Sequence, residues 1–352
     1  MSPEPVAVSP QHRFDEAALD RFLADRLPEY AGGLRVRQFS GGFSNPTFAL
    51  DAVDRDGRPR EYVLRKRPAG DLLPSAHRVD REFRVLRALE GSGVPVPRAR
   101  ALCEDAQVLG QSFFVMDRVE GRLQPNPALP GFGFDERGSV YDSMIDVLAR
   151  LHAVDPAAVG LSDYGKPDGH LRRQVDLWSR QYRSAQTDDL PEMAALGDWL
   201  GGHLPEDGRT SIVHGDYRTN NLLLHPSLPR VEAVLDWELS TIGDPLCDLA
   251  YTCLCYHLPD PPVGFGGADP QALGIPGQEA FVQAYARRAG LAAVRHWEFY
   301  MALQLYKSAS LLQGVYRRGL DGAAPAAAIG MKGHVRSRAA LGLELAGRAT
   351  AG

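Results

Sequence analysis

The sequence predicts an α+β fold in which a small β-rich lobe precedes a larger helical lobe. Three observations support this prediction. Short apolar runs separated by glycine-containing turns fill residues 34–67, helical periodicity dominates after Gly121, and one β-like interruption lies at 211–238. We therefore expect an N-terminal lobe at residues 1–119 and a C-terminal lobe at 120–352, and a cleft between lobes is a favoured place for a ligand site.

The N-terminal lobe is expected to begin with an amphipathic helix, because apolar residues recur at helical spacing from Phe14 to Leu27 and Pro28 follows. A second helix is expected at Arg78–Glu90, where apolar residues again share one face and Gly91 provides a stop. Apolar or alternating runs bounded by glycine and proline predict the strands. The five predicted strands lie within residues 34–39, 47–53, 60–67, 94–106 and 110–121.

The C-terminal lobe is expected to be mainly helical. Its β interruption consists of two short apolar strands within 211–226 and 230–238, which bracket polar loops. Residues 259–276 are rich in proline and glycine and are expected to form a surface loop. The predicted helices lie at Tyr141–Leu151, Leu171–Arg183, Met193–Leu200, Glu279–Arg288, Trp297–Arg317 and Ala324–Leu345.

Composition excludes several classes of protein. The 352 residues are 44% hydrophobic and 24% charged, which is the balance of a globular chain. A formal net charge of −5 provides no basic field that would attract nucleic acid or an anionic membrane. No apolar run approaches the roughly 20 residues that span a bilayer, and the first residues lack a signal-peptide pattern. We therefore expect a cytoplasmic protein with no membrane or nucleic-acid partner.

Cys253, Cys255 and His257 lie close together in the sequence, and we interpret them as part of a buried apolar run rather than a zinc site.

The residues most informative about chemistry are His214-Gly215-Asp216, Asn221 and Asp236, which alternate with apolar strands. Phosphoryl transfer from a nucleotide needs a carboxylate that orients the acceptor hydroxyl, together with oxygen ligands that hold magnesium. Asp216 can serve as that carboxylate, and the oxygens of Asn221 and Asp236 can bind the metal. A metal-dependent hydrolase with His214, Asp216 and Asp236 as ligands also fits these residue types.

The N-terminal lobe offers groups for a nucleotide. The loop Gly41-Gly42-Phe43-Ser44-Asn45 lies between two predicted strands, so its backbone N–H groups can approach phosphates, although a glycine pair there is first of all a hairpin turn. Strand alternation places Arg65 and Lys66 on opposite faces, so only one of these cations can point to the phosphates. Glu82 can hold that cation in place or lie on an exposed helix surface.

Four motifs give the chain a resemblance to a known family. YVLRKRP, FVMDRVEG, HGDYRTNN and VLDWELSTIGDPLCDLAY are similar to segments of the aminoglycoside phosphotransferase and choline kinase-like group. Within that group the sequence most resembles the kinase domain that some proteins carry fused to an acyl-CoA dehydrogenase. The likeness runs from about Phe39 to the C-terminal helices. It implies the bilobal protein-kinase-like fold, with a small β-rich N-lobe and a larger helical C-lobe.

The resemblance also implies roles for individual residues. Asp216 corresponds to the catalytic-loop aspartate, Asn221 to the second metal ligand and Asp236 to the aspartate of the metal-binding triplet. His214 then orients the catalytic loop rather than attacking the substrate. Asp248 resembles the buried aspartate that ties this loop down through backbone hydrogen bonds.

For the nucleotide base, the resemblance places Met116 where the adenine pocket narrows, and it assigns the Asp117 carbonyl and the Val119 amide to the adenine edge. Two features depart from the family pattern. The loop SGGFSNPTF is not the G-x-G-x-x-G of protein kinases, and Arg65 stands where many members carry lysine. Because arginine is a rigid fork rather than a compact charge, this difference changes the geometry of the phosphate contact.

These assignments imply an ATP- and Mg²⁺-dependent kinase that phosphorylates a hydroxyl group of a small metabolite. The link to acyl-CoA dehydrogenases favours a hydroxylated acid or acyl compound as the acceptor, and an aminoglycoside is the other acceptor considered. Two alternatives stay open. One is a nucleotide-binding regulatory module without transfer activity, suggested by the unusual phosphate loop and Arg65, and the other is the metal-dependent hydrolase.

Overall fold

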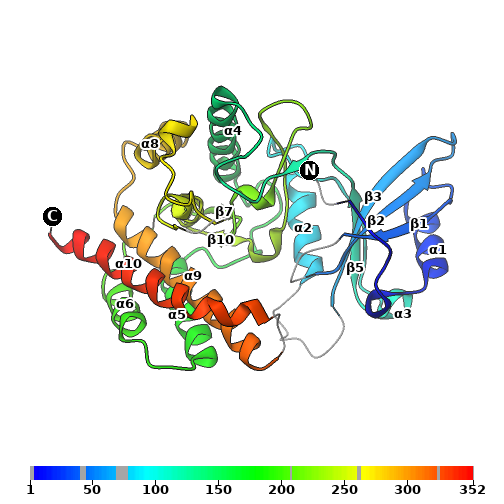
Figure 1. Cartoon of the computed structure of the whole chain (residues 1–352). Coiled ribbons are helices and arrows are strands. Elements are labelled where there is room, and N and C mark those ends of the chain that lie inside the picture. Colours follow the sequence, from blue (N-terminus) through cyan, green and yellow to red (C-terminus); the bar gives the residue numbers. More distant parts are fainter. Residues whose placement is uncertain are drawn as a thin grey trace. The chain divides into compact units, whose positions relative to one another are not determined.

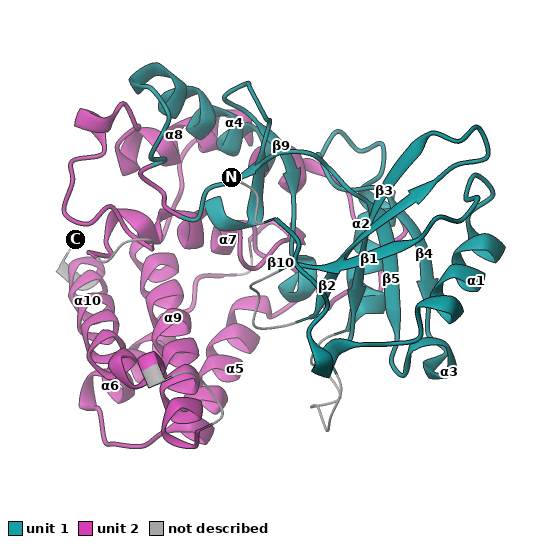
Figure 2. Cartoon of the chain, turned by 45° about the vertical axis from the view of Figure 1, so that its right-hand side comes forward, with its two compact units in different colours: residues 1–125, 129–147, 219–240 teal, residues 126–128, 148–218, 241–352 magenta. Residues whose placement is uncertain are grey.

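The structure is a computed structural model that describes residues 4–39, 45–68, 78–206, 208–259, 263–322 and 326–351. The chain forms two compact units, shown in different colours in Figure 2. Unit 1 comprises Met1–Pro125, Leu129–Val147 and Thr219–Ser240, and unit 2 comprises Asn126–Ala128, Leu148–Arg218 and Thr241–Gly352. The lobe boundary at residues 119 and 120 stays a prediction.

Unit 1 contains a five-stranded antiparallel sheet with strand order β1-β2-β3-β5-β4 (Figure 1). Four of the strands lie within the ranges that the sequence predicts, and β3 begins one residue before its range, because alternation and turn residues determine strands locally. β3 is the middle strand, and in it Arg65 pairs with Thr47 of β2 and Phe114 of β5. The strands are β1 (Arg35–Gln38), β2 (Thr47–Val53), β3 (Pro59–Lys66), β4 (Ala99–Cys103) and β5 (Phe113–Asp117).

Helix α1 (Glu16–Arg26) covers one face of this sheet. Its first turn is capped by the Asp15 carboxylate, which accepts a hydrogen bond from the Ala18 N–H at 3.0 Å. Leu19 and Leu23 are fully buried in a core that the same face of the sheet completes. Burial of a leucine side chain contributes about 1.5–3 kcal/mol, so these two residues anchor the helix.

Helix α2 (Val79–Leu89) carries the expected apolar face, but a charged residue of its first turn lies on that face. Val79, Val85, Leu86 and Leu89 are buried, and Glu82 is buried with them. α2 packs against β4 and β5, so a carboxylate has been brought beside the sheet face that carries Arg65.

A second, three-stranded sheet completes the regular structure of unit 1. Its order is β6-β8-β9, and two of its strands come from the β interruption that the sequence predicts. The short helix α3 and the strand β6 were not predicted, because each has at most four residues and too little periodicity to detect. These elements are α3 (Ala106–Leu109), β6 (Arg122–Leu123), β8 (Leu222–Leu224) and β9 (Val231–Val234).

Unit 2 is mainly helical, as expected, and α9 packs against α5, α6, α7 and α10. Its two-stranded sheet pairs β7 (Ser211–Val213) with β10 (Thr241–Gly243). The sequence predicted one helix at Ala324–Leu345, but a 3-10 helix at Ala326–Met331 precedes α10, and residues 323–325 lie outside the described residues. The helices of this part are α4 (Phe134–Ala153, which begins in unit 1), α5 (His170–Ala185), α6 (Pro191–Gly202), α7 (Leu246–Thr252), α8 (Gln278–Arg288), α9 (Trp297–Leu320) and α10 (Lys332–Ala351).

The predicted α+β class is therefore confirmed: a β-rich N-terminal part is followed by a helical part. In the residues that the structure describes, no helix combines the length and the apolar character that crossing a bilayer requires.

Candidate active site

The loop that carries Asp216 follows β7 and is held by a buried carboxylate of α7. Asp248, whose exposed fraction is 1%, accepts hydrogen bonds from the backbone N–H of His214 at 2.6 Å and of Gly215 at 2.8 Å. Its Oδ2 also lies 3.3 Å from His152 Nε2. The expectation that Asp248 ties this loop down through backbone hydrogen bonds is confirmed.

Two further features fix the course of the loop. Gly215 has φ of +84°, a left-handed conformation that glycine adopts without steric strain. The next N–H, that of Asp216, donates to Nδ1 of the fully buried His214 at 3.1 Å. His214 thus orients the loop with one ring nitrogen, which agrees with the role that the resemblance implies.

The Asp216 carboxylate has two side-chain neighbours that the sequence analysis missed. Arg218 Nε lies 3.0 Å from Asp216 Oδ1, and the hydroxyl of Tyr251 forms a hydrogen bond with the same carboxylate. Burial raises the pKa of Tyr251, as does the negative charge of Asp216, so the phenol stays protonated as a donor. Tyr251 lies in the apolar run LAYTCLCYH, where no sequence signal separates it from a core residue.

In unit 1, Arg65 bridges two carboxylates. Its guanidinium lies 3.2 Å from Glu82 Oε2 and donates a hydrogen bond to Asp236 Oδ1 at 3.0 Å. Lys66 points to the other face of the sheet, where its ammonium lies 5.7 Å from the centroid of the Phe14 ring. Of these two cations, Arg65 is therefore the one that forms an ion pair with Glu82.

Glu82 is 1% exposed, so its interpretation as an exposed helix residue is wrong. Besides Arg65, it accepts a hydrogen bond from Asn45 Nδ2 at 2.8 Å. Burial raises the pKa of Glu82 to about 7, although the Arg65 charge opposes this shift. Asn45 is the one residue of the predicted phosphate loop that is described; Gly41, Gly42, Phe43 and Ser44 lie outside the described residues.

The proposed metal ligands Asn221 and Asp236 lie on adjacent backbone segments. Asn221 ends a 3-10 turn before β8, Asp236 follows β9, and the Leu235 N–H donates to the Asn221 carbonyl at 2.8 Å. Asp236 has φ of +65°, an uncommon conformation for a residue other than glycine and one that often marks a functional position. Its side chain is 32% exposed, whereas Asn221 is buried.

The donor atoms near Asp236 suit a hard cation. Among the described residues, the group of histidine, cysteine or acidic side chains that converges closely enough to hold a metal is Glu82, Asp236 and Glu238, whose ligand oxygens lie within 4.8 Å of one another. This group contains carboxylates alone, which favour Mg²⁺ over softer metals. Cys253 and Cys255 are buried free thiols, burial raises the pKa of Cys253, and the ring of His257 forms a hydrogen bond with Gln278.

The residues predicted to meet adenine lie at the end of β5. Met116 is buried and pairs with Val63 of β3. The Asp117 N–H donates to the Arg98 carbonyl at 2.9 Å, and its carboxylate accepts from Arg100 Nε at 2.6 Å. Val119 is half-buried in the segment after the strand. Their contact with a nucleotide base stays a prediction.

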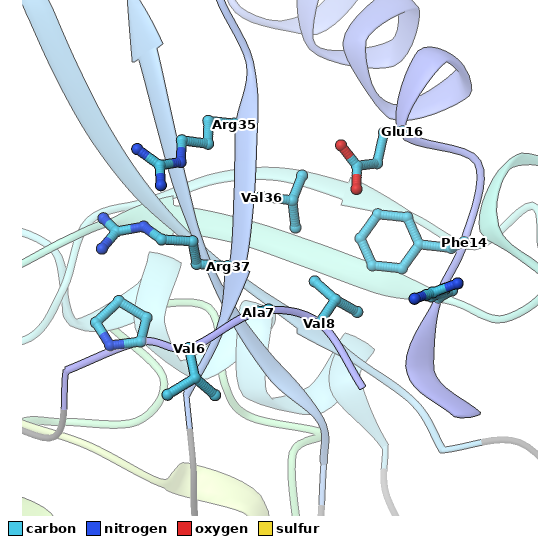
Figure 3. Close-up of a pocket in the computed structure, with 10 residues that line it drawn as sticks. Val6, Ala7, Val8, Phe14, Glu16, Arg35, Val36 and Arg37 are labelled. Carbon is cyan, nitrogen blue, oxygen red and sulfur yellow. The ribbon is translucent and has the colours of Figure 1, made fainter. Parts of the chain in front are cut away.

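A separate hollow of about 560 Å³ lies along the outer edge of β1 (Figure 3). The N-terminal segment forms its other wall, where Val6 and Gln38 exchange two backbone hydrogen bonds. Arg35 and Arg37 project beside it, and Arg37 is paired with Asp51. This hollow contains none of the site residues that the sequence predicts.

Comparison with known sequences finds a family and relatives that agree with the resemblance that the sequence motifs indicate. Residues 35–303 match the model of a family described as "Phosphotransferase enzyme family". The chain is 44% identical over 314 residues to acyl-CoA dehydrogenase family member 10 of Mus musculus, covering 88% of this chain and 29% of that protein. It is 41% identical over 322 residues to acyl-CoA dehydrogenase family member 11 of Homo sapiens, covering 90% and 41%. The chain thus spans less than half the length of these relatives.

Solved structures show the same fold. A candidate aminoglycoside phosphotransferase from Ralstonia eutropha is 42% identical and superposes with a TM-score of 0.86, covering 96% of this chain and 99% of that one. An aminoglycoside phosphotransferase in ternary complex with ADP and hygromycin B superposes with a TM-score of 0.60 at 17% identity, covering 93% and 98%. The second likeness concerns the fold alone.

Proposed function

The chain belongs to the phosphotransferase enzyme family, and from this premise we propose that it is an ATP- and Mg²⁺-dependent kinase that phosphorylates a hydroxyl group of a small molecule. The resemblance inferred from the sequence motifs is confirmed by the family match. The observation that carries the proposal is the loop at Asp216: its backbone is held by Asp248 and His214, and its carboxylate is oriented by Tyr251.

Asp216 accepts the hydrogen bond of the acceptor hydroxyl in this proposal and takes up its proton as the hydroxyl oxygen bonds to the γ-phosphorus of ATP and the bond from that phosphorus to the leaving ADP breaks. A carboxylate does this best when it is held in one orientation before the substrate binds. Tyr251 and Arg218 supply that orientation, and Asp248 keeps the loop backbone from moving.

The nucleotide is assigned to unit 1. Arg65 is the cation offered to its phosphates, with Glu82 holding the guanidinium, and the resemblance assigns Met116, Asp117 and Val119 to adenine. Among the solved structures of this fold, one phosphotransferase is described as bound to ADP and another as a GDP complex. These likenesses support a purine nucleotide as the phosphoryl donor.

Asn221 and Asp236 are the residues that would hold magnesium, and the carboxylate group around Asp236 supports this assignment. When bound, Mg²⁺ neutralises the phosphate charge that develops during transfer. Arg65 donates to Asp236 Oδ1, so the same carboxylate would hold both this guanidinium and the metal.

Cations near Asp216 favour an anionic acceptor. Arg218 Nε lies 3.0 Å from Asp216 Oδ1, and the Lys307 ammonium lies 4.3 Å from the centroid of the Tyr251 ring. Such surroundings repel a polycation such as an aminoglycoside and attract a carboxylate or phosphate. Together with relatives that are named acyl-CoA dehydrogenase family members, they support a hydroxylated acid or acyl compound as the acceptor.

The charges near Asp216 should determine which acceptors the protein uses. Incubated with Mg-ATP and a panel of hydroxycarboxylic acids, their coenzyme A thioesters and aminoglycosides, the protein is expected to phosphorylate an anionic member at least about 10-fold more efficiently, in kcat/KM, than any aminoglycoside, because the cations repel the latter. Product formation is followed by mass spectrometry, and EDTA is expected to abolish it. If no member of the panel gains phosphate while ATP still binds, the kinase proposal fails.

One observation favours a second candidate, a nucleotide-binding module without transfer activity: Arg65 occupies an oxygen of Asp236, the proposed metal ligand. Thermal unfolding separates the candidates. For a kinase, ATP at about 100 times its Kd should stabilise the protein by about 2.7 kcal/mol only when Mg²⁺ is present. Equal stabilisation by ATP without metal supports the module. Stabilisation by metal without nucleotide supports the hydrolase.

A further inference from the structure

Lys307 is a buried cation that contacts the backbone of the candidate catalytic loop. It lies on α9, is 6% exposed, and its ammonium donates a hydrogen bond to the Gly215 carbonyl. The peptide that joins Gly215 to Asp216 is therefore held at both ends, since its N–H donates to His214 Nδ1 at 3.1 Å. No motif in the sequence marks Lys307, which lies 92 positions after Gly215.

The same ammonium also contacts the residue that orients the Asp216 carboxylate. It lies 4.3 Å from the centroid of the Tyr251 ring and 5.4 Å from that of Trp178, distances typical of cation–π interactions. Tyr251 in turn bonds the Asp216 carboxylate through its hydroxyl. Lys307 thus supports Asp216 by two routes, through the peptide before it and through the phenol beside it.

Folding stability does not by itself explain why a charged side chain is buried at position 307. Burial lowers the pKa of Lys307, although the carboxylates of Asp216 and Asp248 oppose the shift. Replacement of a buried ion by an apolar side chain of similar volume is often neutral or stabilising when its partner does not stay buried with an unpaired charge. The partner here is a neutral carbonyl oxygen, so the ammonium orders the loop at the expense of its own hydration.

We propose that Lys307 is a positioning residue that fixes the Gly215–Asp216 peptide and the Tyr251 ring, and through them the Asp216 carboxylate. This inference rests on the proposed kinase function, in which Asp216 receives the acceptor proton.

Lys307→Met tests the proposal, because methionine keeps the length of the side chain and removes the ammonium. Amide hydrogen exchange, read by mass spectrometry on peptides that cover residues 213–218, is expected to be about 10-fold faster in K307M than in the wild type, since one hydrogen bond from a charged donor is lost. With the acceptor identified, kcat is expected to fall by about 10²-fold while KM for ATP changes less than about 2-fold.

A matched control lies on the same helix. Gln313 is equally buried and donates from Nε2 to the Ala185 carbonyl and to Thr187 Oγ1, away from the loop. Gln313→Met removes buried hydrogen bonds as K307M does, but it is expected to leave kcat and loop exchange unchanged. Lys307→Arg, which keeps a charged donor, is expected to restore part of the lost activity and protection.

The results for K307M test the positioning role of Lys307 separately from the kinase proposal. Wild-type loop exchange in folded K307M overturns the positioning role, whatever the acceptor proves to be. Faster loop exchange in a protein without transferase activity supports the loop contact and contradicts the kinase proposal. If K307M does not fold, Lys307→Leu, which also lacks a donor, replaces it; wild-type kcat and exchange in that variant overturn the inference equally.

Discussion

Asp216→Asn is expected to lower kcat by about 10²–10⁴-fold and to leave the Kd for ATP within a factor of about two. The amide has the shape of the carboxylate but cannot take up the acceptor proton, and general-base catalysis contributes a factor of this size. The loop backbone should not move, because its N–H groups are held by Asp248 and His214 rather than by the Asp216 side chain. Steady-state kinetics gives kcat, and titration calorimetry gives the Kd.

Asp198→Asn provides the control for this variant. Asp198 is an exposed carboxylate on α6 of the same unit, and its loss changes the net charge as D216N does. We expect kcat of D198N to equal that of the wild type. If D216N keeps kcat within about 3-fold of the wild type, Asp216 is not the proton acceptor and the proposed chemistry is wrong.

Asp248→Asn is expected to reduce the free energy of unfolding by about 3 kcal/mol. The buried carboxylate accepts from the N–H groups of His214 and Gly215, and an amide offers one acceptor oxygen and turns two donors toward them. Hydrogen bonds to a charged group contribute about 1.5–3 kcal/mol, and a buried donor left unpaired costs a similar amount. Urea unfolding followed by circular dichroism measures the change. An unchanged free energy of unfolding would contradict the inference that Asp248 stabilises the loop through these hydrogen bonds.

The same carboxylate gives stability a pH dependence of defined sign. Burial by itself raises the pKa of Asp248, but its hydrogen bonds with His152 and with the His214 N–H, together with the electrostatic interactions with these two residues, outweigh burial and lower it below the usual value near 3.8. A carboxyl group whose pKa is lower in the folded protein stabilises it fully above the unfolded pKa and loses that contribution as the pH falls through the folded pKa. The stability difference between wild type and D248N should therefore shrink below about pH 4.

The choice between Arg65 and Lys66 illustrates where prediction from sequence ends. Strand alternation established that the two cations lie on opposite faces of β3, but it could not say which face meets α2. That depends on where α1 and α2 pack: α1 joins the core on the face of Leu64, and α2 brings Glu82 to the face of Arg65. The helical pattern alone predicts that a polar residue such as Glu82 is exposed. It could not show that Glu82 is buried against Arg65, which belongs to a different element.

The sequence by itself determined the α+β class, the five strands of the large sheet, most helices, and the spacing of Asp216, Asn221 and Asp236. These features depend on turn residues, periodicity and motifs within short segments, so a single stretch of chain contains their cause. The tertiary structure alone decided that Tyr251 and Lys307 surround the Asp216 loop. Their contacts join residues that lie 35 to 92 positions apart, and a hydrogen bond over such a distance exists only after α7 and α9 have packed against each other and buried both partners.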